Sequence, residues 1–264
     1  ARQAARRRRA GQERPTEGGP EFAFGTWLLS FMSSTFELGF SWAQRNRYSY
    51  AQVAPPSSLV EERKRFTRRT FTLDAGDIQR LKQRIVHLAE SHGAPLPRPP
   101  STFTAVVALA WTCFARCKPF SSEDDAQLFF FADTRARLDP PVDVGYIGAC
   151  LTWLISKLPV PELRGDRALA AAASTVQDGI HKVKEDPVAG WNFYMLMADA
   201  SMGRMMNISG SSGKPMRTEP ITMNHDGQVA LMRSRDGRGV QVSLSLLRPA
   251  HMDAFKSNFH ELLK

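Results

Sequence analysis

Apolar residues recur at three- and four-residue spacing in several segments beyond residue 66, and in other segments they alternate or run without interruption. The first pattern predicts helices and the second predicts β-strands. Helices are predicted within 68–93 (after a short strand), 101–117, 166–186 and 249–264; strands within 126–135, 146–160 and a hairpin at 227–247; and a helix followed by a strand within 190–206. Because helices and strands interleave, the sequence predicts an α/β fold with a mixed β-sheet flanked by helices.

Two of the predicted helices carry more specific signals. Asp74 precedes the first helical stripe and Asp77 follows three residues later, a variant of the capping box that begins many helices. Segment 101–117 is apolar on nearly every side, which is typical of a central, buried helix. We therefore expect residues such as Val106 and Leu109 to be fully buried.

The charge of the chain is unevenly distributed. The net charge is +9, and residues 1–14 hold six Arg and one Glu, so +5 lies there and +4 is left for the other 250 residues. No zinc-finger, helix-turn-helix or RNA-binding aromatic pattern accompanies the basic block. A specific nucleic-acid-binding protein is therefore disfavoured, although it stays an alternative from a different functional class.

The composition divides the chain into three parts. Residues 1–20 are predicted to be a disordered basic tail, 21–65 a poorly defined N-terminal segment and linker, and 66–264 the folded domain. The apolar stretch from Phe22 to Trp42 is broken by serines, Thr35 and Glu37, so it favours a partly buried helix over a membrane span. The chain begins with Ala rather than Met, and we expect it to be a piece of a longer protein, a processed product or an incomplete gene model.

The cysteines do not predict a disulfide framework. Cys113, Cys117 and Cys150 are an odd and sparse set, typical of buried thiols in a reducing compartment, and we expect a cytoplasmic protein. Cys113 and Cys117 lie four residues apart without a second Cys or His pair at metal-ligand spacing, so no metal site is predicted.

Several segments, taken in order, carry a resemblance to a known family. They are "STFTAVVALAWTC" at 101–113, "FFADTRARLDPPVDVGYIGACL" ending at Leu151, "GW" at 190–191, "GKP" at 213–215, "VALMRSRDGRGVQVSLSL" at 229–246 and the closing "MDAF…F…LL". Together they resemble the C-terminal half of the plant BAHD acyltransferases, and the resemblance covers roughly residues 66–264. The chain looks most like the branch that acylates anthocyanins and other phenolic glycosides.

The resemblance implies a fold and an activity. The fold is the C-terminal domain of the coenzyme A-dependent acyltransferases, and the activity is transfer of an acyl group from acyl-CoA to a hydroxyl or amine of a phenolic acceptor. Acyl-CoA enters as a co-substrate, and no bound cofactor is implied. Apart from the resemblance, we expect a monomer with no membrane partner and no specific nucleic-acid partner.

Arg135 and Arg137 stand at a corner between two predicted strands, and two interpretations remain open. They could form ion pairs that lock the edge of the sheet. Alternatively, they could contact an anionic group such as a coenzyme A phosphate or a dicarboxylic acyl chain. Ala149 replaces the Asn that is usual in the family at that place.

The family's catalytic motif is missing. In the family, the His of His-x-x-x-Asp is a general base on the acceptor and the Asp orients it. None of the six histidines here is followed four residues later by Asp; His181 with Glu185 comes nearest and is interpreted as a surface pair one helical turn apart. No catalytic residue is therefore predicted.

The second family hallmark, Asp-Phe-Gly-Trp-Gly, is also largely absent. The segment "NISGS" at 207–211 resembles the residues that precede this motif in the family, and "GKP" at 213–215 resembles the end of the motif. Of the five motif residues, only Gly213 is therefore left. Two hypotheses follow: an acyltransferase by descent whose missing parts lie outside this sequence, or a catalytically inactive remnant that at most binds coenzyme A or a partner domain.

Overall fold

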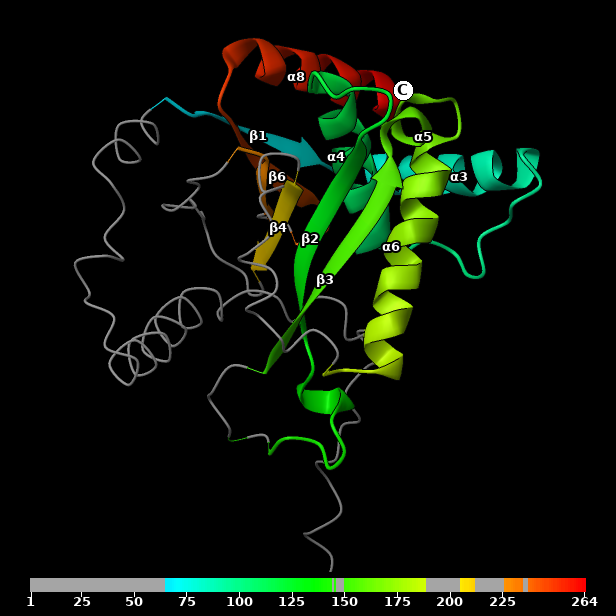
Figure 1. Cartoon of the computed structure of the whole chain (residues 1–264), viewed down its shortest axis with the longest axis vertical. Helices are drawn as coiled ribbons and strands as arrows, with labels where there is room; N and C mark the ends of the chain where they lie inside the picture. The colour runs from blue at the N-terminus through cyan, green and yellow to red at the C-terminus, as the bar shows by residue number, and fades with distance from the viewer. Residues whose placement is uncertain (1–64, 144, 146–149, 189–204, 212–225, 235–236) are drawn as a thin grey trace, which may run out of the picture.

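The computed structural model describes residues 65–143, 145, 150–188, 205–211, 226–234 and 237–264. These residues form one mixed sheet with packed helices, which confirms the predicted fold class (Figure 1). In chain order the elements are β1 (Thr67–Leu73), α3 (Ala75–Ser91), α4 (Thr102–Cys117), β2 (Asp125–Asp133), a 3-10 turn η3 (Arg135–Arg137), β3 (Leu151–Pro159), α5 (Val160–Arg164), α6 (Ala168–Glu185), β4 (Met205–Ser211), β5 (Gln228–Arg233), β6 (Val240–Leu246) and α8 (Pro249–Leu263).

The sheet has the strand order β1-β6-β5-β4-β2-β3. The pairs β2–β4 and β4–β5 are parallel, and the other three pairs are antiparallel. The predicted hairpin at 227–247 is confirmed as β5 and β6, with Gly237 in its turn at a φ of 72° that glycine adopts without strain. A strand, a corner and an antiparallel strand are likewise found where "FFADTRARLDPPVDVGYIGACL" predicts them.

The described helices pack against one face of the sheet, where their apolar residues join those of the strands in a single core. Helix α4 lies at its centre: Val106, Leu109 and Ala110 are at most 1% exposed, as its unbroken apolar sequence predicts. The C-terminal helix α8 closes one end of the core, where Phe259 packs 4.7 Å from the ring of Phe71. The stripe predicted for α8 is confirmed, since Met252, Phe255, Phe259 and Leu262 are all buried.

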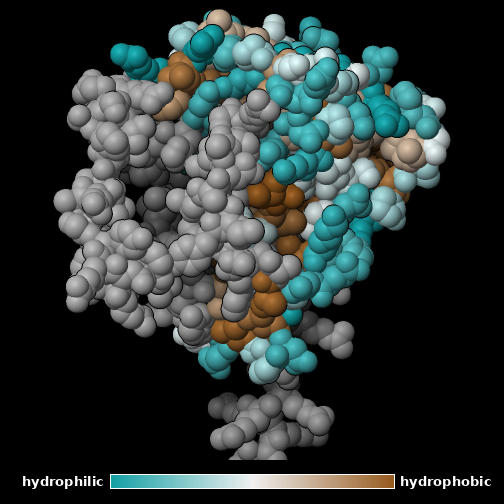
Figure 2. Space-filling view, viewed as in Figure 1, coloured by the Kyte–Doolittle hydropathy of each residue, from teal (hydrophilic) through white to brown (hydrophobic). Residues whose placement is uncertain are grey.

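The opposite face of the sheet is apolar at the β2–β3 end. Phe129 on β2 packs against Phe131, Trp153 and Ile155, and the partners across the two strands are Phe129 with Ile155 and Phe131 with Trp153. Figure 2 shows apolar side chains gathered over these strands on the viewed surface. We call these four residues the aromatic patch.

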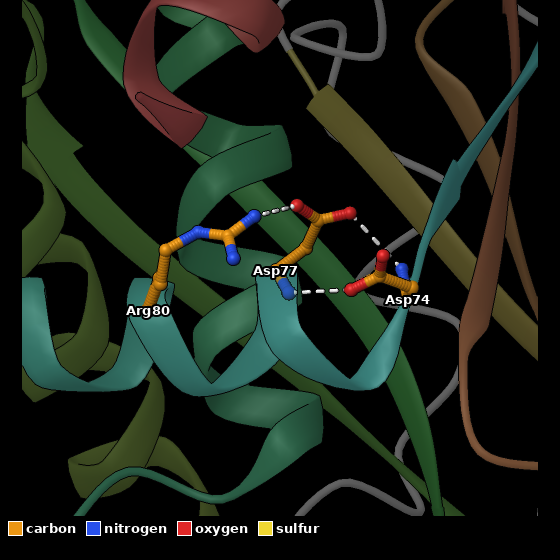
Figure 3. A network of polar contacts seen from close by, with 3 residues as sticks. All are labelled: Asp74, Asp77 and Arg80. Carbon is orange, nitrogen blue, oxygen red and sulfur yellow. Dashed lines mark hydrogen bonds and ion pairs between the residues drawn. The ribbon is translucent and has the colours of Figure 1, made fainter.

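A capping box begins α3 as predicted. The Asp74 side chain accepts a hydrogen bond from the backbone N–H of Asp77 at 2.7 Å, and the Asp77 side chain accepts one from the N–H of Asp74 at 3.1 Å. Arg80 on the next turn donates to the other oxygen of Asp77 (Figure 3). Both orphan N–H groups are satisfied, and the negative charge lies at the positive end of the helix dipole.

Replacing Asp74 with alanine should lower the free energy of unfolding by about 1 kcal/mol, because one helix-terminal N–H loses its acceptor. Asp74→Ser, which keeps an oxygen acceptor, is the matched control and should recover most of that loss. Equilibrium urea unfolding of both variants measures the effect. Equal stability of the two variants would contradict the capping role.

Some predictions need correction or lie outside the described residues. The predicted strand 146–160 includes Val160, and no element is predicted for 161–165, but Val160–Arg164 form the short helix α5, because Pro161 favours the first turn of a helix. The tail 1–20, almost all of 21–65 and the predicted helix in 190–206 lie outside the described residues. The three cysteines are buried and free, as predicted.

Two properties of the described segments bear on other classes of function. None of their helices combines the length and the apolar character that a membrane crossing requires. No group of three or more His, Cys, Asp or Glu side chains in the same segments is arranged to hold a metal ion.

Candidate functional site

The corner after β2 is built by hydrogen bonds from Thr134. Its backbone N–H and its hydroxyl both donate to the carbonyl oxygen of Cys150, at 2.8 and 3.0 Å. These two hydrogen bonds join the two ends of the connection between β2 and β3. The carbonyl of Thr134 then accepts from the N–H groups of Arg137 and Leu138, which tightens the chain into the η3 turn. Thr134 is fully buried, so the position of both arginines is fixed by the end of the sheet.

The two arginines of this corner differ in their surroundings. The carboxylate of Asp133 accepts from the backbone N–H of Arg135 at 2.9 Å and from its guanidinium at 3.2 Å, with both side chains about one-fifth exposed. Arg137 is half-buried, and no ion pair to its guanidinium is present within the described part of the chain. The ion-pair interpretation is therefore confirmed for Arg135, and no such pair is seen for Arg137 among the residues that the structure describes.

The histidines of the described segments do not form a base with an orienting carboxylate behind it. His181 Nδ1 lies 3.3 Å from Glu185, with side chains 53% and 65% exposed, so the predicted surface pair is confirmed. His251 is half-buried, and its pKa is lowered chiefly by burial and then by the nearby Lys118. Asp226 is near enough to oppose this shift, but within the described part of the chain no carboxylate hydrogen-bonds to the ring, and the buried Nδ1 has no hydrogen-bond partner.

The cysteine thiols are also unsuited to nucleophilic chemistry. Burial raises the pKa of Cys117 to about 12 and that of Cys113 well above its usual range. A thiol reacts as its thiolate, so both groups are inert near neutral pH. The pKa of Cys150 is raised as well, again mainly by burial.

A largely buried ion pair that the sequence did not predict joins Lys118, which follows α4, to Asp226, which precedes β5. The ammonium of Lys118 pairs with Asp226, with side chains 7% and 25% exposed, and lies 5.5 Å from the centre of the Phe114 ring. The second oxygen of Asp226 accepts from the N–H of Leu247 at 3.1 Å. Because the ammonium of Lys118 and both oxygens of Asp226 have partners within the fold, we interpret the ion pair as a stabilising structural contact.

Lys118→Ala should lower the free energy of unfolding by about 3 kcal/mol, because the partly buried carboxylate of Asp226 is left without its cation. The double variant Lys118→Met with Asp226→Asn removes both charges and should be closer to wild type. Chemical denaturation of the single and double variants measures the difference. If Lys118→Ala is as stable as the double variant, the ion pair does not have this stabilising role.

A comparison with known families decides where this scaffold belongs. The model described as the Transferase family matches residues 42–193, which is more than half of the chain. The chain is a member of the BAHD acyltransferase family. The expected family is thereby confirmed.

Curated relatives of the chain include proteins named as coumaroyl- and malonyltransferases. Agmatine coumaroyltransferase of Arabidopsis thaliana is 25% identical over 224 residues, which cover 78% of this chain and 48% of the relative. An anthocyanin 5-O-glucoside malonyltransferase of Salvia splendens is 27% identical, over 73% of this chain and 43% of the relative. The chain therefore spans about half the length of the curated relatives it matches.

Solved structures support the same fold for this BAHD chain. Vinorine synthase matches 75% of the chain with a TM-score of 0.56 at 16% identity, and the match covers 48% of that structure. The structure of Fusarium graminearum TRI101 complexed with coenzyme A and deoxynivalenol matches 73% with a TM-score of 0.59 at 18% identity, over 47% of that structure. The fold of the BAHD chain is that of one half of a coenzyme A-dependent acyltransferase.

Proposed function

We propose that this chain is the C-terminal half of an acyltransferase that moves an acyl group from acyl-CoA to a hydroxyl or amine of a phenolic or phenolic-glycoside acceptor. Membership of the BAHD family carries the proposal. Relatives named as coumaroyl- and malonyltransferases of anthocyanins and phenolic glucosides support the acceptor class. The buried, free thiols are compatible with a reducing, cytoplasmic setting.

The chemistry of the proposed reaction defines what a protein must supply. The acceptor oxygen or nitrogen attacks the thioester carbonyl, the carbon–sulfur bond breaks, and coenzyme A leaves as its thiol. A general base must take the proton of the acceptor, and the anionic coenzyme must be held in place. We assign the second task in part to this chain and the first to residues that this sequence does not contain.

Arg137 is the residue that we propose for contact with an anionic group of the co-substrate. Its neighbour Arg135 already shares its charge with Asp133, whereas the Arg137 guanidinium is without an ion pair among the residues that the structure describes. The buried Thr134 anchors the turn that carries it. A cation held at a fixed corner suits a coenzyme A phosphate or the free carboxylate of a dicarboxylic acyl chain.

Calorimetric titration of the purified chain with coenzyme A tests the proposal. Arg137→Gln should weaken binding about 10–100-fold, the loss of one charge-assisted hydrogen bond of about 1.5–3 kcal/mol, with the melting temperature unchanged. Arg98→Gln removes the same charge from an exposed site and is the matched control. Equal affinity of the wild type, Arg137→Gln and Arg98→Gln would rule out the assigned contact.

The alternative is an inactive member of the family that only binds coenzyme A or a partner domain. The absence of any His followed four residues later by Asp favours it for the chain by itself. Binding of coenzyme A without product formation would support this alternative. Product formation once the other half of the enzyme is supplied would support the first.

A further inference from the structure

A hollow of about 210 Å³ lies on the helical side of the sheet, where residues of α3, α5 and α6 meet the end of β3. Figure 1 shows these helices beside one another, and α6 contacts both α3 and α5. Leu158, which lines the hollow, belongs to the main core together with Leu154, whereas Trp153 and Ile155 belong to the aromatic patch. Because successive side chains of a strand point to opposite faces, the hollow and the aromatic patch lie on opposite faces of the sheet.

The hollow is also far from the two arginines that follow β2. Leu158 is paired with Ala126 near the start of β2, whereas Arg135 and Arg137 come directly after its end at Asp133. The register runs for seven residues from Ala126 to Asp133, and a strand rises about 3.3 Å per residue, so about 20 Å separates the two places. The hollow is therefore distinct from the corner to which we assign the anionic co-substrate.

Small apolar side chains form much of the wall of the hollow. Leu88 and Ala89 belong to α3, Ala170 and Ala171 belong to α6, and Leu158 lies near the end of β3. Alanine fills little of the space between two packed helices, so room is left between them. A cavity of about 150 Å³ is enough to hold benzene, so this hollow has room for an apolar group of roughly four to six carbon atoms.

Charged groups of both signs lie at the rim of the hollow. The Arg167 guanidinium donates to the carboxylate of Glu162 at 3.3 Å, with side chains 51% and 39% exposed. An exposed ion pair of this kind contributes little to stability, because water screens it and both side chains lose freedom. The two groups can therefore exchange each other for the opposite charges of a ligand at small cost.

Two further hydrogen-bond acceptors line the same hollow. The Nδ1 of His92 donates to the carbonyl of Leu88 at 2.9 Å, which leaves Nε2 as the acceptor of the neutral ring. The hydroxyl of Thr175 donates to the carbonyl of Ala171 at 3.0 Å, so its oxygen is still able to accept a hydrogen bond. With the carboxylate at the rim, these acceptors suit a ligand that carries an ammonium group as well as an anionic one.

We propose that this hollow binds a free amino acid with an apolar side chain. The carboxylate of the ligand pairs with Arg167, and its ammonium donates to Glu162 and to His92. Its side chain enters the space between α3 and α6, while both charges stay at the rim near water. A simple acid or amine would give only one partner of the ion pair a new contact, whereas a zwitterion gives one to both. The site does not rest on the proposed acyl transfer.

Calorimetric titration of the full chain with L-leucine tests the proposal. The matched probes are 4-methylpentanoate and 3-methylbutylamine, which keep the carbon skeleton but lack the ammonium and the carboxylate respectively. L-Leucine should bind saturably, and each probe should bind about tenfold more weakly or less, because one charge-assisted hydrogen bond is lost. Absence of saturable binding of L-leucine, or equal affinity for either probe, would overturn the assignment of a zwitterion.

Three variants locate the site. Ala171→Leu fills the hollow from α6 at a half-buried position and should abolish binding of L-leucine. Arg167→Gln should weaken it about tenfold. Lys184→Gln removes a positive charge from the last turn of the same helix and should leave the affinity unchanged. The melting temperature of each variant shows whether it is folded, and a folded Ala171→Leu variant that binds like the wild type would place the ligand elsewhere and refute the site.

Discussion

Replacing Trp111 with alanine should lower the free energy of unfolding by about 3–5 kcal/mol. Trp111 lies on α4 and is fully buried, surrounded by the apolar residues of the same helix and by the single core that the sheet and helices share. Removing the indole leaves a large cavity at a place where helices and strands meet from several directions and cannot all move inward. For a domain that is stable by about 5–15 kcal/mol, such a loss consumes a large part of the total.

Trp111→Phe separates the effect of volume from that of the polar nitrogen. The buried indole Nε1 has no hydrogen-bond partner in the described segments, so the Trp111→Phe variant loses only packing contacts. Its free energy of unfolding should therefore fall much less than that of the Trp111→Ala variant. Lys256→Ala on the exposed side of α8 should change stability by less than about 0.5 kcal/mol. Urea unfolding followed by circular dichroism gives all three values, and a loss below about 1 kcal/mol for Trp111→Ala would contradict the central position of α4.

Local sequence signals were sufficient for most helices and strands. The capping residues Asp74 and Asp77 are only three residues apart in the sequence, and the apolar character of 101–117 is visible from that segment alone. Helix α5 was missed because five residues are too short for a helical period to show. Its proline at the first turn was the one signal that could have found it.

Contacts between distant residues were beyond the sequence. Lys118 and Asp226 are 108 residues apart, and nothing in either segment indicates that the fold brings them together. The two arginines after β2 show the same limit at short range, because the sequence alone does not distinguish the role of Arg135 from that of Arg137. Only the position of Asp133 at the end of β2 shows which of the two is neutralised.

The second large effect is on catalysis: this chain, assayed alone, should transfer acyl groups no faster than the buffer blank. An acceptor hydroxyl is a weak nucleophile at neutral pH, and a positioned general base contributes about 10²–10⁴-fold. His181 is exposed and paired with Glu185 on the surface of α6. His251 has a lowered pKa, and within the described residues its buried Nδ1 has no hydrogen-bond partner, so no carboxylate orients its ring through that nitrogen.

Positioning is the second contribution that the chain is expected to lack. The family resemblance implies that donor and acceptor meet between two halves of the enzyme, and this chain spans about half the length of its relatives. Holding two reactants in a productive geometry can supply roughly 7–11 kcal/mol of the barrier reduction. Loss of either contribution would bring the rate close to the uncatalysed one, and loss of both should leave no measurable transfer.

The most direct test is a product assay with a labelled acyl-CoA donor and a phenolic glucoside acceptor. It compares the purified chain with a longer version that restores the half of the enzyme found in its relatives, including the His-x-x-x-Asp and Asp-Phe-Gly-Trp-Gly segments. We expect product from the longer version and none above the blank from this chain. Transfer by this chain alone that is abolished by His181→Ala or His251→Ala would contradict it.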